Sequence, residues 1–242
     1  MAADPRIDIV MAVRGGYGLS RIIGQLDFVA LAETRKIFVG FSDFGVFNLA
    51  ALAHCGMVSF AGPMAAVDLC HDQPSALTEA SFWGLLGNSS FPLPTVSCAH
   101  DYPPQQIEGT IWGGTLALVT HLLGTPYFPH LQDGILFLED INEEPYRVER
   151  MLMQLWHAGV LQRQRAILIG DFQNCRPGSL SHTAYTMQDV LQTLSERYEG
   201  PLLLNFPFGH IKDKITIPIG GRANLRLLDG AYQITFSDYN AD

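Results

Sequence analysis

The chain has 242 residues, of which 48% are hydrophobic, so it can bury one large core or two modest ones. Its 24 acidic and 15 basic side chains give a formal charge of -9 without a basic cluster, which argues against nucleic acid or an anionic membrane surface as a partner. The sequence has neither the apolar run of about 20 residues that spans a membrane nor the pattern of a secretory signal at its start.

The cysteines predict a reduced, cytoplasmic protein. Cys55, Cys70, Cys98 and Cys175 are scattered, with no Cys-x-x-Cys pair. A chain of this length does not need disulfides to be stable, so free thiols are the simplest interpretation. Three of the cysteines lie within two residues of a histidine, but such isolated pairs lack the spacing of a metal-ligand framework. We expect neither a metal nor another cofactor.

The first 88 residues are predicted to form an α/β domain. Short apolar runs, typical of buried strands, alternate with segments that have helical spacing. Strands are predicted at residues 7–13, 36–40 and 57–60, and helices at residues 19–26, 43–54 and 75–86. Gly87 follows the last helix at a common stop position. This alternation of strand and helix is typical of a parallel sheet covered by helices.

Residues 89–106 are predicted to be a linker between two domains. The segment is rich in proline, serine and other polar residues, and its apolar residues show no period. Domain boundaries commonly fall in such segments.

Residues 107–242 are predicted to form a second domain, of mixed α/β type. Strands are predicted at residues 134–140, 165–171 and 201–206, and helices at residues 116–123, at residues 145–158 and after Thr186. The C-terminal end differs, because Asp229-Gly230 separates two alternating runs, which is the pattern of a β-hairpin. The expected fold class is therefore α/β, with antiparallel strands at the end of the second domain.

One serine stands where a strand gives way to a helix, in the stretch VGFSDFG at residues 39–45. At such a turn the hydroxyl is exposed at the carboxyl end of the sheet, and free N–H groups of the following helix can stabilise an oxyanion. The Gly-x-Ser-x-Gly signature of the α/β-hydrolases is absent, and a helix N-cap is the commoner role for a serine in this place. Ser42 is a candidate nucleophile that needs a base and a group to orient that base.

Two residues of the second domain are candidates for these roles. His210 ends the stretch FPFGH after an apolar run, on a loop at the carboxyl end of a strand, where ligand sites of α/β sheets collect. Glu139 ends another apolar run, and a buried carboxylate needs a partner such as an imidazole N–H. The alternative for Glu139 is that it is solvated at the strand end or pairs with Arg147 or Arg150.

Taken together, the motifs resemble the LD-carboxypeptidases of murein recycling, a family of serine peptidases that includes the microcin C immunity hydrolases. The matching segments are RGGYG, GFSDF, GTIWGG, LFLEDINE and FGH, at residues 14–18, 40–44, 109–114, 136–143 and 208–210. Their order and approximate spacing fit the family along the whole chain. The set is far more specific than any one of its motifs.

The resemblance implies a catalytic triad in the order Ser-Glu-His along the chain. Ser42 is then the expected nucleophile, His210 the general base and Glu139 the residue that orients His210. In such enzymes the serine comes from the first domain and the other two residues from the second, so the active site is expected between the domains.

The resemblance also implies roles around the triad. The backbone N–H of Asp43, with one from Gly15 or Gly16, is expected to form the oxyanion hole. Trp112 and Thr115 are expected to line the substrate site. Thr115 stands where the family usually carries an asparagine, so the fine specificity is expected to differ.

The activity implied is release of the terminal D-alanine from murein tetrapeptide, without a metal, by a homodimeric enzyme. One alternative is a hydrolase of another amide, such as a peptidyl-nucleotide antibiotic. Another is a catalytically silent homologue. The family usually carries further residues before the RGGYG strand, including the first strands of the sheet, so the N-terminal domain is expected to be truncated.

Overall fold

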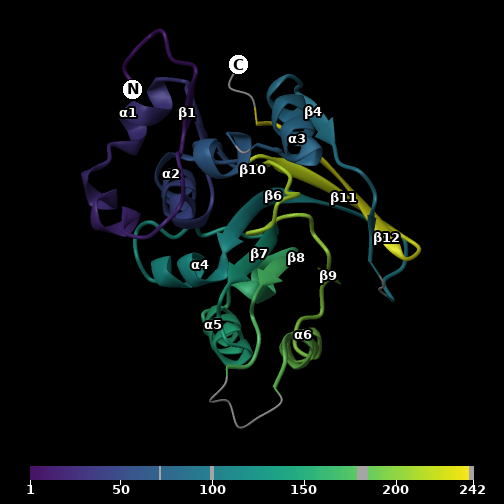
Figure 1. Cartoon of the computed structure of the whole chain (residues 1–242). Coiled ribbons are helices and arrows are strands. Elements are labelled where there is room, and N and C mark those ends of the chain that lie inside the picture. The colour runs from purple at the N-terminus through teal and green to yellow at the C-terminus, as the bar shows by residue number, and fades with distance from the viewer. Residues whose placement is uncertain (71, 99–100, 179–184, 240–242) are drawn as a thin grey trace.

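The computed structural model describes residues 1–70, 72–98, 101–178 and 185–239, which fold around two sheets (Figure 1). The smaller sheet has the strand order β1 (Ile9–Met11), β2 (Ile37–Val39), β3 (Ser59–Ala61) and β10 (Ile217–Ile219). The first three strands are parallel, whereas β10 pairs antiparallel with β3. A strand from late in the chain therefore joins the sheet that carries Ser42.

The larger sheet combines parallel and antiparallel strands. Its path is β4 (Ser90–Pro92), β12 (Ala231–Ser237), β11 (Arg222–Leu228), β6 (Gln106–Thr115), β7 (Gly134–Ile141), β8 (Gln164–Gln173) and β9 (Leu202–Leu203), with β5 (Val96–Ser97) beside β12. From β6 to β9 the strands are parallel, and the hairpin of β11 and β12 is antiparallel. The predicted α/β fold class, with antiparallel strands at the C-terminal end, is confirmed.

Most helices lie where the sequence predicts them. They are α1 (Phe28–Glu33), α2 (Gly45–Cys55), α3 (Ala76–Leu86), α4 (Leu116–Leu122), α5 (Pro145–His157) and α6 (Met187–Ser195). Capping side chains explain where two of them begin: Ser75 accepts the N–H of Thr78 at α3, and Thr186 forms a reciprocal capping box with Asp189 at α6.

The segment before β2 differs from the prediction. The helix expected at residues 19–26 is instead two short 3-10 turns, η1 (Leu19–Arg21) and η2 (Ile23–Gln25). The regular helix of this region is α1, which follows at once and was not predicted. Asp27 begins it by accepting the N–H of Ala30, so an N-cap signal was present in the sequence.

The predicted linker at residues 89–106 instead contains two short strands. β4 and β5 both pair antiparallel with β12, so this segment belongs to the larger sheet. The partner strand β12 lies far along the chain, and the segment has no apolar period of its own that would indicate a strand. The division of the chain at residues 88 and 107 stays a prediction.

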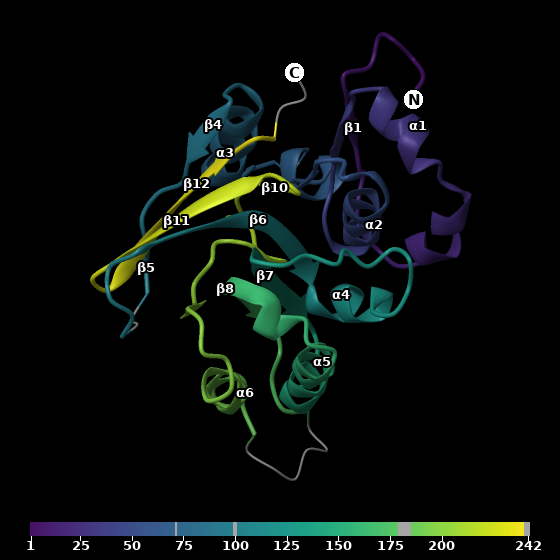
Figure 2. The same cartoon turned by 180° about the vertical axis from the view of Figure 1, so that it is seen from behind.

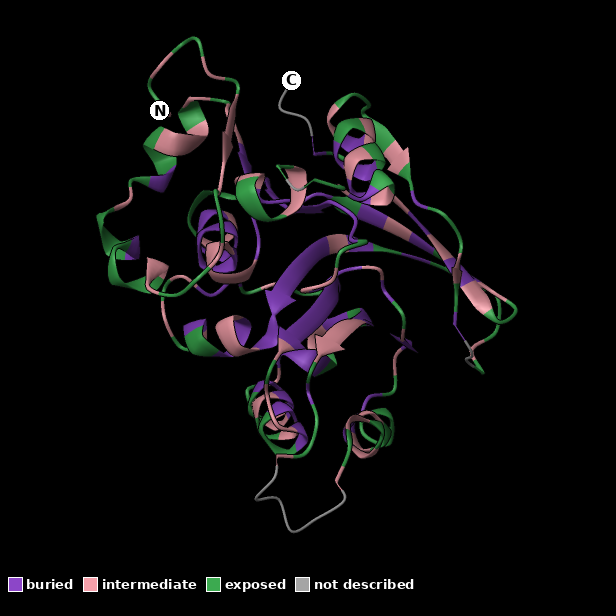
Figure 3. Ribbon diagram, in the orientation of Figure 1, coloured by how far each residue is buried: buried purple, intermediate pink, exposed green. Residues whose placement is uncertain are grey.

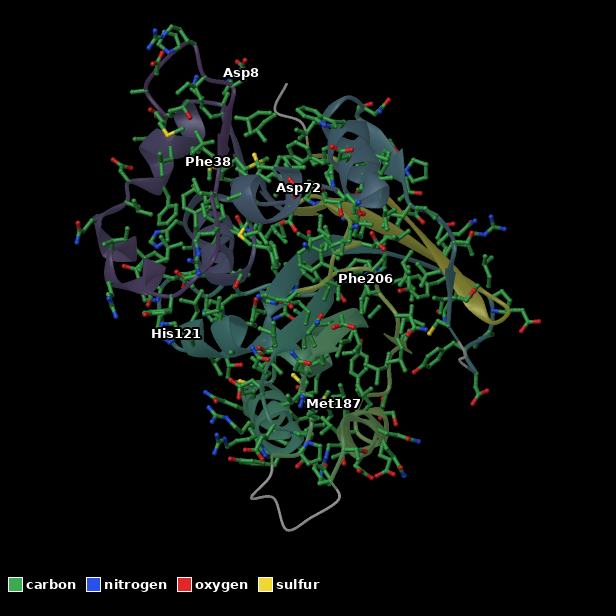
Figure 4. The ribbon with its side chains drawn as sticks, in the orientation of Figure 1. Asp8, Phe38, Asp72, His121, Met187 and Phe206 are labelled. Carbon is green, nitrogen blue, oxygen red and sulfur yellow. The ribbon has the colours of Figure 1, made fainter. Side chains whose placement is uncertain are left out.

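The core consists of two apolar clusters on opposite faces of the sheets, because successive strand side chains point to opposite sides. In β2, Phe38 belongs to one cluster and Val39 to the other, and in β7 the same holds for Leu136 and Phe137. Each cluster contains side chains of both sheets. β7 is buried over all but its last residue, and the second half of β6 is buried beside it (Figure 3). Figure 4 labels Phe38 and Phe206, one from each cluster.

The helices divide between these two faces. One cluster contains apolar side chains of α2, α4, α5 and α6, whereas the other contains those of α3 and of the β11–β12 hairpin. The view from behind shows α5 and α6 on the opposite side of β7 and β8 from the hairpin (Figure 2). Directly after β10, the Gly220 N–H donates to the Ile111 carbonyl and the Gly221 carbonyl accepts the Ile111 N–H, so this turn joins the smaller sheet to β6.

Candidate active site

Ser42 lies on a strained turn directly after β2. Its φ of 59° places it in the left-handed region, which a residue with a Cβ atom rarely adopts. The 3-10 turn η3 (Ser42–Phe44) follows and leads into α2, and its cap position is Phe41 rather than Ser42. Asn48 of α2 donates a hydrogen bond of 3.0 Å to the Gly40 carbonyl and so closes the turn. Ser42 is therefore not an N-cap, and its hydroxyl is free to face the second sheet.

The structure brings Ser42, His210 and Glu139 into one chain of contacts. His210 Nε2 lies 2.9 Å from Ser42 Oγ, and His210 Nδ1 lies 2.7 Å from Glu139 Oε2. Glu139 is fully buried, and the His210 side chain is 16% exposed. A carboxylate only accepts hydrogen bonds, so it selects the tautomer in which Nδ1 carries the proton and Nε2 can accept one from the serine.

An irregularity in the larger sheet positions His210. The register of β7 against β8 shifts beside Glu139, between Leu138 and Asp140. At this point the chain after β9 docks on β8: Phe206 donates to the Ile169 carbonyl at 3.0 Å, and the Phe208 carbonyl accepts the Asp171 N–H at 2.9 Å. Bulges of this kind redirect the chain beside active sites. The backbone therefore holds the His210 loop against the end of β8.

Thr115 contacts the carboxylate of Glu139. Residues 115 and 139 are register partners in the parallel pair β6–β7, and the Thr115 hydroxyl donates a 2.6 Å hydrogen bond to Glu139 Oε1. Thr115 is buried. Both oxygens of Glu139 are thus engaged, one by Thr115 and the other by His210. The structure therefore gives Thr115 a contact with the carboxylate, and its substrate-lining role stays a prediction.

Trp112 lies in the apolar core. Its side chain is fully buried, donates from Nε1 to Gln164 Oε1 at 2.9 Å and packs edge-on against Phe128. It belongs to the apolar cluster under the helices, on the opposite face of β6 from Thr115. The structure thus places Trp112 in the core, and its substrate-lining role stays a prediction.

Replacing Thr115 by valine is expected to lower kcat about tenfold with little change in KM. Valine keeps the shape but removes the donor to Glu139, and a hydrogen bond to a charged group contributes about 1.5–3 kcal/mol. Thr115→Ser keeps the hydroxyl and is expected to retain most of the activity. Steady-state kinetics on both variants is the measurement, and equal kcat values for the valine and serine variants contradict the role.

The loop after β1 lies directly against the serine. A Cβ atom on Gly15 would lie 2.9 Å from Ser42 Cβ and 3.0 Å from its Oγ, so only glycine allows this approach. Asp43 Oδ2 accepts the N–H of Leu19 at 3.0 Å and ties the loop to the serine turn. Gly16, next to Gly15, has a φ of 144°. The oxyanion hole from the N–H groups of Asp43 and Gly15 or Gly16 stays a prediction.

A pocket of about 380 Å³ opens beside His210. Its lining includes Phe41, Met64, Ile141, His210, Lys212 and Lys214. Lys214 is buried and forms an ion pair with Asp68, and its Nζ lies 4.9 Å from the centre of the Phe41 ring. That ring packs edge-on against the His210 imidazole at 5.1 Å. The sequence signal for this wall was a lysine in the apolar run KITIPIG, but nothing in the sequence indicated its partner.

Asp140 is a second buried carboxylate next to Glu139. Its side chain points the other way, toward α4, and accepts the N–H of Ala117 at 2.8 Å. Burial raises the pKa of Asp140 to about 6, although hydrogen bonds from the Ile141 and Ala117 N–H groups oppose the shift. Burial also raises the pKa of Asp171, as does the nearby charge of Glu139. Burial in this region thus disfavours the ionised form of the Asp140 and Asp171 carboxyl groups.

Asp140 is expected to make stability depend on pH. Its pKa is higher in the folded than in the unfolded protein, so the folded state binds more protons between about pH 4 and pH 6, and stability falls as pH rises through that range. Asp140→Asn removes this dependence. The free energy of unfolding of the variant relative to the parent is expected to rise by about 3 kcal/mol from pH 4 to pH 7. Urea unfolding at both pH values measures it, and parallel pH profiles contradict it.

Two further properties concern ligands and membranes. Within the described residues, no group of three or more histidine, cysteine or acidic side chains is arranged to hold a metal ion. The helices of the described part of the chain are also too short or too polar to cross a membrane.

Comparisons with known proteins agree with one another. The family model of the LD-carboxypeptidase N-terminal domain matches residues 1–62, and that of the C-terminal domain matches residues 108–225. A probable murein peptide carboxypeptidase of Bacillus subtilis is 35% identical over 224 residues, which cover 92% of this chain and 70% of the relative. The crystal structure of muramoyltetrapeptide carboxypeptidase from Oxalobacter formigenes is 42% identical, with a TM-score of 0.91 over 99% of this chain and 81% of that chain.

A more distant likeness shows the shared fold alone. The structure of MccF in complex with glutamyl sulfamoyl guanosine is 23% identical, with a TM-score of 0.85, and the match covers 99% of this chain and 79% of that one.

Proposed function

Because this chain belongs to the LD-carboxypeptidase family of serine-type hydrolases, we propose that it releases the terminal D-alanine of murein tetrapeptide and leaves the tripeptide. The observation that carries the proposal is the pair of contacts at His210, 2.9 Å to Ser42 and 2.7 Å to Glu139. The similarity to a muramoyltetrapeptide carboxypeptidase supports the choice of substrate.

In the first half of the proposed reaction, Ser42 Oγ attacks the carbonyl carbon of the L-centre of meso-diaminopimelate. The hydroxyl proton passes to His210 Nε2, and Glu139 stabilises the imidazolium that forms. The negative charge on the former carbonyl oxygen is stabilised by the N–H of Asp43 and one from the Gly15 loop. His210 then protonates the nitrogen of D-alanine, the C–N bond breaks, and an acyl ester remains on Ser42.

In the second half, water replaces the departed D-alanine. His210 Nε2 accepts a proton from the water as its oxygen attacks the ester carbon. When the ester bond breaks, the proton returns to Ser42 Oγ and the tripeptide leaves with a new carboxylate. Both oxygens of the buried Glu139 carboxyl group have a partner, Thr115 on one and His210 on the other, so the carboxyl group keeps its orientation through both halves of the reaction.

The preassembled contacts also support an active enzyme over a catalytically silent homologue. In a silent protein nothing would maintain a left-handed serine turn that costs on the order of 1–3 kcal/mol. A peptidyl-nucleotide substrate would use the same triad. Trp112, which we expected to line the substrate site, is buried in the structure and favours neither substrate. Two further parts of the proposal are the cytoplasmic location, which rests on the scattered cysteines, and the homodimer, which rests on the family resemblance.

The test is release of free D-alanine from L-Ala-γ-D-Glu-meso-diaminopimelate-D-Ala by the purified chain. The matched control is the same peptide ending in L-alanine, which we expect to remain intact. An aminoacyl sulfamoyl nucleoside, assayed in parallel, represents the alternative substrate class. A folded protein that leaves the tetrapeptide intact overturns the proposal, and cleavage of the nucleoside alone favours the alternative.

A further inference from the structure

The pocket beside His210 carries positive charge in an otherwise acidic protein. The chain has a formal charge of -9 and three lysines, Lys36, Lys212 and Lys214. Two of these lysines line the pocket, and among the described lining residues Asp68 is the acidic one. The pocket therefore has a surplus of one positive charge, which favours an anionic group on the ligand.

The buried ion pair leaves Lys212 as the cation that is available to a ligand. Lys214 and Asp68 are 3% and 6% exposed and neutralise each other, and the second oxygen of Asp68 accepts the Met64 N–H at 2.8 Å. Lys212 is exposed, and within the described part of the chain it forms no ion pair with an acidic side chain. The surplus charge of the pocket is thus that of Lys212.

The loop that carries Lys212 is held in place. Thr78 of α3 lies with its hydroxyl oxygen 3.1 Å from the Lys212 carbonyl and 2.8 Å from the Lys214 carbonyl, and it accepts the Lys214 N–H at 3.1 Å. These bonds fix the backbone on both sides of residue 213. The backbone from which the Lys212 side chain extends is therefore held in place beside the pocket, so a ligand need order only that side chain.

The pocket lies on the side of the scissile bond from which the product amine leaves. His210 must face that nitrogen in order to protonate it, and His210, Ile211 and Lys212 line the pocket in sequence. Gly15 and Gly16, on the side expected to face the oxyanion, are not among its lining residues. A group bound in this pocket is therefore the one that the reaction releases.

We propose that Lys212 binds the free α-carboxylate of the departing D-amino acid and so determines that the enzyme removes a terminal residue. The inference rests on the proposed function and deepens it. The small side chain of that residue is accommodated by the apolar part of the pocket, where Met64, Val67 and Ile211 lie. The Lys214–Asp68 pair forms the wall behind Phe41 and takes no direct part.

The test compares the tetrapeptide with the same peptide ending in D-alaninamide, which lacks the terminal charge. Lys212→Met is expected to lower kcat/KM for the acid about tenfold to a hundredfold, mainly through KM, and to leave the amide unchanged. Lys212→Arg keeps the charge and is expected to retain most activity on the acid. The matched control is Lys36→Met, which removes a lysine outside the pocket. Equal changes for both peptides, or no change for either, overturn the proposal.

A binding measurement tests the carboxylate site independently of the proposed catalytic function. Ser42→Ala removes the nucleophile, so calorimetry on that variant measures binding of both peptides without turnover. If the parent releases no D-alanine, the proposed function fails. The carboxylate site nevertheless stands if Ser42→Ala binds the acid more tightly than the amide and the added Lys212→Met change removes that preference. It fails if the two peptides bind equally.

Discussion

Ser42→Ala is expected to release D-alanine from the murein tetrapeptide about 10⁴- to 10⁶-fold more slowly than the parent. The variant keeps His210 and Glu139 in contact but has no oxygen to form the acyl ester. Progress curves with the tetrapeptide give kcat/KM directly. Labelling by a fluorophosphonate, read by mass spectrometry, locates the reactive serine independently of the substrate, and we expect it on residue 42 of the parent alone.

The control for this variant is a substitution of another serine, Ser59, which lies in the smaller sheet. Ser59 of β3 is fully buried, and its hydroxyl has no hydrogen-bond partner among the described residues. Ser59→Ala is therefore expected to keep full activity and the stability of the parent or slightly more. Ser42→Ala should also unfold at nearly the parent's denaturant concentration. Activity of Ser42→Ala within tenfold of the parent, or labelling of a different serine, contradicts the assignment.

Gly113→Ala is expected to destabilise the protein by at least about 4 kcal/mol, enough to prevent folding in many domains. Gly113 has a φ of 134°, and a Cβ atom on it would lie 1.9 Å from the Phe137 carbonyl oxygen of the neighbouring strand. The two residues are register partners in the buried pair β6–β7, so neither backbone can move aside. Because β6 and β7 also carry Thr115 and Glu139, any surviving protein is expected to lose activity.

Two other glycines serve as matched controls for this prediction. Gly114 has a similar φ of 141°, but an added Cβ would meet nothing within 4 Å, so Gly114→Ala tests backbone strain without the clash. We expect a loss of about 1–3 kcal/mol. Gly45, at the start of α2, has φ -56° and open space, and Gly45→Ala is expected to be neutral or to stabilise by up to about 1 kcal/mol. Urea unfolding measures the free energy of unfolding of all three variants. Similar losses of stability for Gly113→Ala and Gly45→Ala contradict the clash.

The elements that local pattern determines were predictable from the sequence. Helices α2 to α6, strands β7 and β8 and the hairpin at Asp229-Gly230 lie within a few residues of their expected places. Pairing between distant segments was not predictable, because the hydrophobic pattern of a strand does not indicate which other strand it pairs with. This is why β4 and β5 read as a linker and why the return of β10 to the first sheet was not expected.

The site shows the same division. The contacts of His210 with Ser42 and Glu139 agree with the predicted triad, although the roles themselves stay proposals. The residues around them were harder to place, because the strand GTIWGG is buried on both faces and gives no sign of which face meets the site. Trp112 and Thr115 consequently received the same role, while the structure places one in the core and the other against Glu139.

The pairing of β10 with β3 determines when, during synthesis, the enzyme is completed. β1, β2 and β3 leave the ribosome early and carry Ser42 with them, but the strand that closes the edge of β3 is made late. Until then the nascent chain exposes an open strand edge, which is prone to mispair and is a target for chaperones. His210 is translated only just before β10. A ribosome-bound chain that has not reached residue 210 therefore carries Ser42 without the histidine that we propose as its base.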